Sequence, residues 1–180
     1  MDIPPARWVL YRRNASRPAR VRLSPTRTGV FGMADEGIDD RAYGALRETF
    51  ESKGWGYKAV PENRGIVSSF QGNDLAIGYH AFVSDGMIRM AAILSFKVPA
   101  ERMRDFVWSL NAINSDLPFG SFSMNPADGY VTFDYALVYK GTVPSADLIA
   151  DVVVTMINTA DRFDGSLRGL VEGKGERSSA

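Results

Sequence analysis

The feature that most constrains this chain is a pair of β-hairpin patterns with one amphipathic helix between them. In the first hairpin, apolar residues alternate over 75–83 and 87–96, and Ser84-Asp85-Gly86 joins the two segments. Asp-Gly accepts the positive φ angles that a tight turn requires. Two strands joined by so few residues must pair antiparallel. A second hairpin is predicted over 120–139 from the same alternation around a glycine-containing loop.

The helix between the hairpins is predicted to begin at Pro99, which suits a first helical position because it has no amide proton to leave unpaired. Its apolar side chains recur at helical spacing and form one stripe: Met103, Phe106, Val107, Leu110, Ile113 and Leu117. Burial of each such side chain contributes roughly 1.5–3 kcal/mol before entropy is subtracted. We therefore expect this helix to pack on the sheet.

A further helical pattern precedes the predicted strands in the sequence. We expect this helix to begin near Asp39, with Asp39 as its N-cap and with Ile38 and Tyr43 as a hydrophobic staple. Gly54 is predicted to end the helix as the residue that adopts a left-handed conformation.

The remaining elements complete the order α-β-β-β-β-α-β-β-α. Two short strands are predicted at 55–60 and 66–70, with a loop between them. Ser145 is the expected N-cap of a last helix, in which Gly165 is a weak point. This interleaving predicts an α+β fold: a single antiparallel sheet of five or six strands with helices packed on it.

The formal net charge of zero hides an uneven distribution of charge along the chain. Residues 1–34 carry seven arginines and one acid, so their net charge is 7 − 1 = +6. Residues 35–180 carry the other 14 basic and 20 acidic side chains, which gives −6. Nucleic-acid binding is therefore not expected of the domain and would have to involve the basic arm.

We expect residues 1–34 to be a disordered basic arm, residues 35–173 to form one domain and residues 174–180 to be a disordered tail. The arm is rich in Pro, Ser and Thr and lacks helical or strand periodicity. It has three interpretations: translation that in fact starts at Met33, a tail without a dedicated partner, or an arm for nucleic acid or another anionic surface.

The residue types present restrict the possible chemistry. The chain has no cysteine and one histidine, His80, which excludes a disulfide scaffold, a thiolate zinc site and an iron–sulfur cluster. His80 falls within a predicted strand, and no nucleophile motif accompanies it, so we interpret it as structural. We predict no catalytic, cofactor-binding or metal-binding residues, and therefore no enzyme.

Other polar groups have structural interpretations. Four acids suit the positive end of the first helix dipole: Asp35, Glu36, Asp39 and Asp40. Asp161 and Asp164-Gly165 resemble a fragment of a calcium loop but lack its other ligands, so we interpret them as helix punctuation. The end of the middle helix carries side chains that suit either a small polar ligand or a helix terminus: Asn111, Asn114, Ser115 and Asp116.

Several segments between Ala42 and Val171 share residues with one bacterial family. They are Leu46 to Tyr57, Ile66 to Gly72, Val98-Pro99, Leu110 to Asn114, Gly120-Ser121-Phe122, Val131 to Phe133 and Asp161-Arg162-Phe163. On these residues the chain resembles the YbjN family of sensory transduction regulators. The resemblance implies a fold like that of type III secretion chaperones, which commonly dimerise and present their surface to protein clients. The family pattern supplies no catalytic residues.

These observations together predict a non-enzymatic bacterial regulator or chaperone-like protein that binds a protein client or forms a homodimer. The alternative is a sensor domain that binds a small ligand in a pocket between the second helix and the sheet. No apolar run approaches the roughly 18 residues of a membrane span, so we expect a cytoplasmic protein without a membrane partner.

Overall fold

The fold is a six-stranded antiparallel sheet with helices, seen in a computed structural model that describes residues 36–173. The predicted arm (1–34) and tail (174–180) lie outside the described residues. The elements are α1 (Glu36–Ser52), β1 (Lys58–Val60), β2 (Gly65–Gln71), β3 (Ala76–Ser84), β4 (Met87–Lys97), α2 (Met103–Ser115), β5 (Ser121–Met124), β6 (Tyr130–Val138) and α3 (Ala146–Glu172). The strand order is β1-β2-β3-β4-β6-β5. The predicted fold class and element order are confirmed.

The turn between β3 and β4 has the geometry that its sequence predicts. Asp85 and Gly86 both have positive φ angles, of 55° and 71°. A two-residue turn with this geometry matches the twist of the strands that it joins. The register therefore pairs Ser84 with Met87 next to the turn and continues along both strands.

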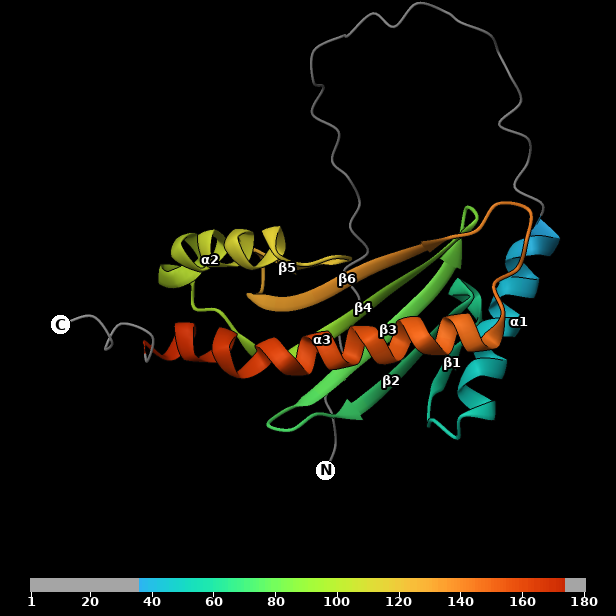
Figure 1. Ribbon diagram of the computed structural model, residues 1–180, viewed down its shortest axis with the longest axis horizontal. Helices are drawn as coiled ribbons and strands as arrows, with labels where there is room; N and C mark the ends of the chain where they lie inside the picture. The colour runs from blue at the N-terminus through green and yellow to red at the C-terminus, as the bar shows by residue number, and fades with distance from the viewer. Residues whose placement is uncertain (1–35, 174–180) are drawn as a thin grey trace, which may run out of the picture. The chain divides into compact units, whose positions relative to one another are not determined.

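One face of the sheet is covered by α1 and α3, and α3 runs across the strands in Figure 1. Alternate residues of β3 point into this layer: Ile77, Tyr79, Ala81 and Val83 are all buried. Phe50 of α1 lies at the centre of an aromatic cluster, with the rings of Trp55, Tyr57, Phe70 and Tyr79 within 6.3 Å of its own. The apolar core therefore lies between this face and the two helices.

The end of α1 follows the prediction for Gly54. This glycine has a φ of 68°. Its amide donates to the carbonyl of Glu51 at 3.2 Å, and the amide of Trp55 donates to the carbonyl of Phe50 at 2.9 Å. This pair of bonds is a Schellman motif, which satisfies two carbonyls at the end of the helix.

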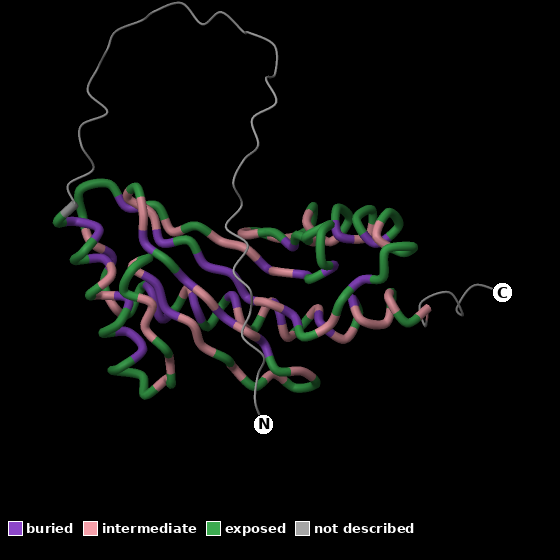
Figure 2. The backbone as a smooth tube through the Cα atoms, turned by 180° about the vertical axis from the view of Figure 1, so that it is seen from behind, coloured by how far each residue is buried: buried purple, intermediate pink, exposed green. Residues whose placement is uncertain are grey.

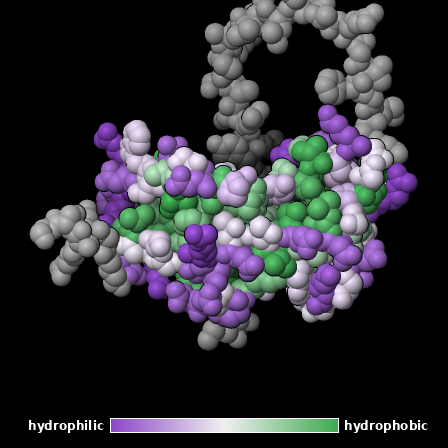
Figure 3. Space-filling view, in the orientation of Figure 1, coloured by the Kyte–Doolittle hydropathy of each residue, from purple (hydrophilic) through white to green (hydrophobic). Residues whose placement is uncertain are grey.

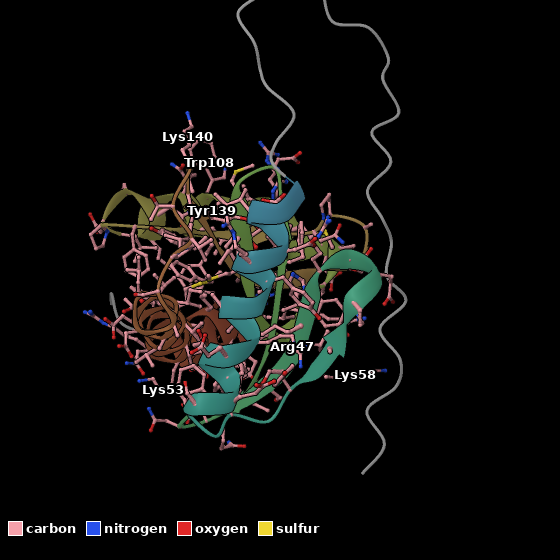
Figure 4. The ribbon with its side chains drawn as sticks, turned by 90° about the vertical axis from the view of Figure 1, so that its right-hand side faces the viewer. Arg47, Lys53, Lys58, Trp108, Tyr139 and Lys140 are labelled. Atoms are coloured by element: carbon pink, nitrogen blue, oxygen red, sulfur yellow. The ribbon has the colours of Figure 1, made fainter. Side chains whose placement is uncertain are left out.

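The start of α1 differs from the prediction, because Asp39 lies inside the helix and is not its N-cap. The carboxylate is buried, and its Oδ1 accepts hydrogen bonds from the Tyr139 hydroxyl at 2.7 Å and the Gly86 amide at 3.2 Å. Tyr139 lies beside the first turns of α1 in Figure 4. Asp39 therefore joins the helix to the sheet, a role that only the tertiary contacts create.

The position of α2 also differs from the prediction. A 3-10 turn, Ala100–Arg102, precedes the helix, so Pro99 stands before the first helical residue. Phe106 and Leu110 are buried, whereas Val107 is 48% exposed. The apolar stripe is therefore narrower than predicted. The helix packs against the edge strand β5 rather than across the sheet (Figure 1).

The last helix, α3, begins at its predicted cap and is continuous over its whole length. The Ser145 hydroxyl accepts a hydrogen bond from the Leu148 amide at 3.2 Å, which confirms the predicted cap. The helix continues without a break through Gly165 to Glu172. Asp161 and Asp164 are therefore helical residues, and their interpretation as helix punctuation is wrong.

Candidate functional site

The face of the sheet opposite α1 and α3 is left uncovered by the described helices, and Figure 2 views the sheet from that side. We call this surface the open face. Its central residues are Gly78, His80, Phe82, Met87, Arg89, Ala91, Ile93, Thr132, Asp134, Ala136 and Val138. Burial alternates accordingly, because Phe82 and Val138 are 37% and 57% exposed while their core-facing neighbours are buried or half-buried.

A cavity of about 480 Å³ lies on the open face where β3, β4 and β6 run side by side. It is lined by His80, Phe82, Met87, Arg89, Met90, Ala91, Asp134, Tyr135 and Ala136. None of these residues belongs to α2, so the cavity differs in position from the pocket expected between the second helix and the sheet. Small side chains produce the hollow, since Ala91 and Ala136 lie among larger neighbours.

His80, Ala91 and Asp134 are direct neighbours across three strands. Because Ala91 is short, the imidazole and the carboxylate on either side of it influence each other electrostatically. Burial lowers the pKa of His80, and the negative charge of Asp134 partly opposes this shift. The net effect favours a neutral imidazole in the folded protein.

Asp134 also receives hydrogen bonds from two hydroxyl groups on its other side. Ser123 donates to Oδ2 at 2.5 Å, and Thr132 donates to the same oxygen at 2.8 Å. In a nucleophilic triad the hydroxyl donates to the imidazole and the carboxylate orients that imidazole. Here both hydroxyls donate to the carboxylate, so the arrangement holds the Asp134 side chain in place and does not activate an oxygen nucleophile.

Arg89 is the exposed cation beside the cavity. Its guanidinium lies over the ring of Phe82, with 6.0 Å from Cζ to the ring centroid. Arg89 forms no ion pair with any residue in the range 36–173. The site therefore combines an apolar hollow, a hydrogen-bonded carboxylate and a cation without a carboxylate partner in that part of the chain.

Polar residues at the end of α2 make hydrogen bonds within the protein. The Asn114 side-chain amide donates to the Phe122 carbonyl at 2.9 Å, and its oxygen accepts from the Phe122 amide at 2.7 Å. Asn114 thus occupies the place that a further strand would take beside β5. Ser115 donates to the Ala112 carbonyl, and Asp116 is the helix C-cap, so the structural interpretation of these residues holds.

The acidic residues that resembled part of a calcium loop lie on α3, beside the β2–β3 turn. Asp161 accepts hydrogen bonds from the backbone and side-chain nitrogens of Asn73, which holds the β2–β3 turn against α3. Asp164 is buried, and this burial raises the pKa of its carboxyl, with the charges of Asp161 and Asp74 adding to the shift. Among the described residues, no cluster of His, Cys, Asp and Glu suits a metal ion.

Alternation along the strand predicts that His80 shares a face with Gly78 and Phe82, opposite Ile77, and the structure agrees. The sequence did not identify Arg89, Ala91 or Asp134 as its neighbours. Alternation alone assigns each residue to a face of its strand. It does not show that β6 lies beside β4, which is the pairing that brings Asp134 next to Ala91. A small residue such as Ala91 indicates a hollow only when the strand beside it, and therefore its larger neighbours, are known.

None of the described helices combines the length and the apolar character needed to cross a membrane. No curated protein matches the sequence. A solved structure, the crystal structure of YbjN from E. coli, "a putative transcription regulator", has the same fold with a TM-score of 0.52. It shares 13% sequence identity, and the match covers 71% of this chain and 90% of that chain.

The sequence of the domain also matches a family model. The model is YbjN, described as "Putative bacterial sensory transduction regulator", and it matches residues 43–168. This range runs from the second turn of α1 into the C-terminal part of α3 and includes every strand of the sheet. The chain therefore belongs to the YbjN family.

Proposed function

We propose that this protein is a non-enzymatic bacterial regulator that acts by binding another protein on the open face of its sheet. One observation carries the proposal: α1 and α3 cover one face, while the other face exposes Phe82 and Val138 around a cavity. Apolar surface that is rimmed by polar groups is typical of protein interaction sites.

The family and the fold agree with a regulatory role. The family model is described as a "Putative bacterial sensory transduction regulator", and the E. coli structure as "a putative transcription regulator". Direct contact of the domain with nucleic acid is less consistent with its charge, since residues 35–180 carry a net charge of −6. We therefore propose that the regulation proceeds through a protein partner, and that nucleic acid would contact the basic arm alone.

The arrangement of polar groups supports binding rather than catalysis. The hydroxyls of Ser123 and Thr132 donate to Asp134, which fixes the carboxylate and lowers its availability as a general base. Burial favours the neutral form of His80. We propose that these groups shape the polar rim of the binding surface.

A photo-crosslinking experiment tests the proposal. Benzoylphenylalanine is incorporated at Val138, which is exposed on the open face outside the lining of the cavity, or, as a control, at Asn158 on the exposed side of α3. We expect a covalent adduct with one partner protein from position 138 and none of that adduct from position 158. Equal adducts from both positions, or none from position 138, would contradict the proposed surface.

A homodimer and a chaperone-like action follow from the resemblance and remain predictions. The same crosslinking experiment separates them, because an adduct of twice the chain mass identifies a second copy on the open face. Light scattering across the micromolar range supplies an independent measurement, and a monomer throughout would contradict the homodimer.

A second candidate function is a sensor of a small ligand, which the volume of the cavity favours. Cavities of about 300–1,000 Å³ are typical of small-molecule sites. Screening a metabolite library for an increase in melting temperature tests this candidate, because a ligand that binds only the folded state stabilises it. A shift that persists after Ala136→Trp fills the cavity would show that the ligand binds elsewhere.

A further inference from the structure

We infer that the open face selects a partner segment in which an acidic side chain lies next to a large apolar one. The carboxylate of the partner binds Arg89, and its apolar side chain enters the cavity above Ala91. This inference rests on the proposed function and names the chemistry of the partner for the same surface.

The charges of the open face favour an anionic group over a cationic one. Asp134 is half-buried and accepts hydrogen bonds from two neighbouring hydroxyl groups. Arg89 is exposed and forms no ion pair with a carboxylate in residues 36–173. The charged group that an approaching partner reaches first beside the cavity is therefore the Arg89 guanidinium.

The position of Arg89 suits recognition of a carboxylate. Its guanidinium rests over the ring of Phe82, and such stacking leaves the edge of the guanidinium free to donate hydrogen bonds. A carboxylate accepts two parallel hydrogen bonds from this edge. Because the stacking restricts the side chain before binding, less conformational entropy is lost when the partner arrives.

The cavity supplies the apolar half of the recognition. Ala91, Phe82 and Met87 are among the open-face residues that line it. A volume of about 480 Å³ exceeds what one aromatic side chain needs, so part of the partner's backbone also fits. Burial of such a side chain removes apolar surface from water on both partners, which is the main favourable contribution to the association.

The extent of the apolar surface favours a protein segment over a small molecule. Val138 is 57% exposed and lies outside the lining of the cavity, on the same face and next to Met87. A ligand confined to the cavity would leave Val138 in water, whereas a segment laid along β4 and β6 covers both. Figure 3 shows the opposite side of the molecule, where hydrophilic atoms are interspersed with hydrophobic ones.

Selection of phage-displayed random peptides on the immobilised full chain tests the inference. Synthetic copies of the selected peptides are then titrated by fluorescence anisotropy against the wild type, Arg89→Glu, Ala136→Trp and Arg162→Glu. Arg162→Glu is the matched control, because Arg162 is also exposed, also lies over an aromatic ring, that of Phe163, and changes the net charge by the same amount. Circular dichroism checks that each variant is folded.

We expect the selected peptides to be enriched in Asp or Glu next to Phe, Leu or Trp. Arg89→Glu should weaken their binding by about tenfold or more, because a favourable charge pair becomes a repulsive one. Ala136→Trp should abolish binding, and Arg162→Glu should leave the affinity within about twofold of the wild type.

Three results would overturn the inference, and they separate it from the proposed function. Peptides without acidic residues that Ala136→Trp blocks would refute the acidic partner but retain the open face. Peptides that bind Ala136→Trp as well as the wild type would refute both the inference and the proposed surface. Failure to select any peptide, while crosslinking at position 138 still captures a partner, would show that a short acidic and apolar segment is not what this face recognises.

Discussion

Asn114 shows how one side chain can protect the edge of a sheet. It bonds both the amide and the carbonyl of Phe122, the two backbone groups that would otherwise be offered to another chain. This contact links two segments on which the family resemblance depends, Leu110 to Asn114 and Gly120 to Phe122. The side-chain hydrogen bonds of Asn114 are therefore structural contacts.

We expect Asn114→Ala to lower the free energy of unfolding by about 1–3 kcal/mol, because it leaves two partly buried backbone groups without partners. Urea denaturation measures this loss. The control is Asn111→Ala on the exposed side of the same helix, which should change stability by less than about 0.5 kcal/mol. Faster hydrogen exchange at the Phe122 amide should accompany Asn114→Ala alone, and equal effects of the two substitutions would contradict this role.

The Tyr139 hydroxyl and the Asp39 carboxylate form a second contact of this kind, with both residues buried. We expect Tyr139→Phe to lower the free energy of unfolding by about 1–3 kcal/mol, because the carboxylate loses a hydrogen-bond donor away from water. Thermal or urea denaturation measures the change.

The control for this prediction is Tyr130→Phe. Tyr130 is 39% exposed, and the phenylalanine keeps the ring that lies under the Lys97 ammonium group. Its effect should stay below about 0.5 kcal/mol. A Tyr139→Phe variant as stable as Tyr130→Phe would show that the bond to Asp39 contributes little.

At the scale of the element, α3 tolerates two glycines that its sequence would be expected to avoid. An added Cβ at Gly169 meets no atom within 4 Å, whereas one at Gly165 comes 3.3 Å from the Asp74 carboxylate. Glycine lowers helix stability by roughly 1 kcal/mol relative to alanine. We therefore expect Gly169→Ala to raise the free energy of unfolding by about 0.5–1 kcal/mol, and Gly165→Ala to raise it by less.

Urea denaturation of both variants under one set of conditions measures the difference. The pair is matched, since the residues lie one turn apart in the same helix and differ in what an added methyl group meets. A larger gain from Gly165→Ala would mean that the Asp74 side chain moves away without cost.

α2 shows why periodicity predicts the presence of a helix better than its location. The predicted stripe contained Val107, which the structure leaves 48% exposed. With Val107 included, the apolar stripe of the helix is wide enough to pack across a sheet. The sequence alone therefore favoured packing of this helix on the sheet. The loop that leads into the edge strand β5 instead places the helix beside the sheet, where only Phe106 and Leu110 are fully enclosed.

At the scale of the whole molecule, the pH dependence of stability has a contribution from His80. Burial lowers its pKa in the folded state, while the unfolded chain keeps a value near about 6.5. Below that pH the unfolded state binds a proton that the folded state resists. The free energy of unfolding should therefore fall as the pH drops from about 6.5 towards the lower pKa of the folded state.

His80→Gln should remove this part of the pH dependence, because glutamine occupies the position without titrating. The comparison is specific, since the chain has no other histidine. Urea denaturation of the wild type and the variant at several pH values between about 5 and 7 gives the two slopes. Identical slopes would show that the pKa of His80 does not change on folding.

The sequence by itself determined the elements, their order and the family. Alternation, helical spacing and turns such as Asp85-Gly86 depend on residues that are close along the chain. They can therefore be recognised without knowledge of the tertiary structure. The same local signals identified the Ser145 cap and the end of α1 at Gly54, and the structure confirms both.

Only the tertiary structure decided the partner of Asp39, the position of α2 and the residues that surround His80. Each depends on segments far apart along the chain: Asp39 meets Tyr139, and Ala91 meets Asp134. The alternation of apolar and polar residues shows that a strand has two different faces. It does not show which face the helices cover or which strand is its neighbour in the sheet. The open face is therefore a property of the packing, because it exists only where α1 and α3 have taken the other side of the sheet.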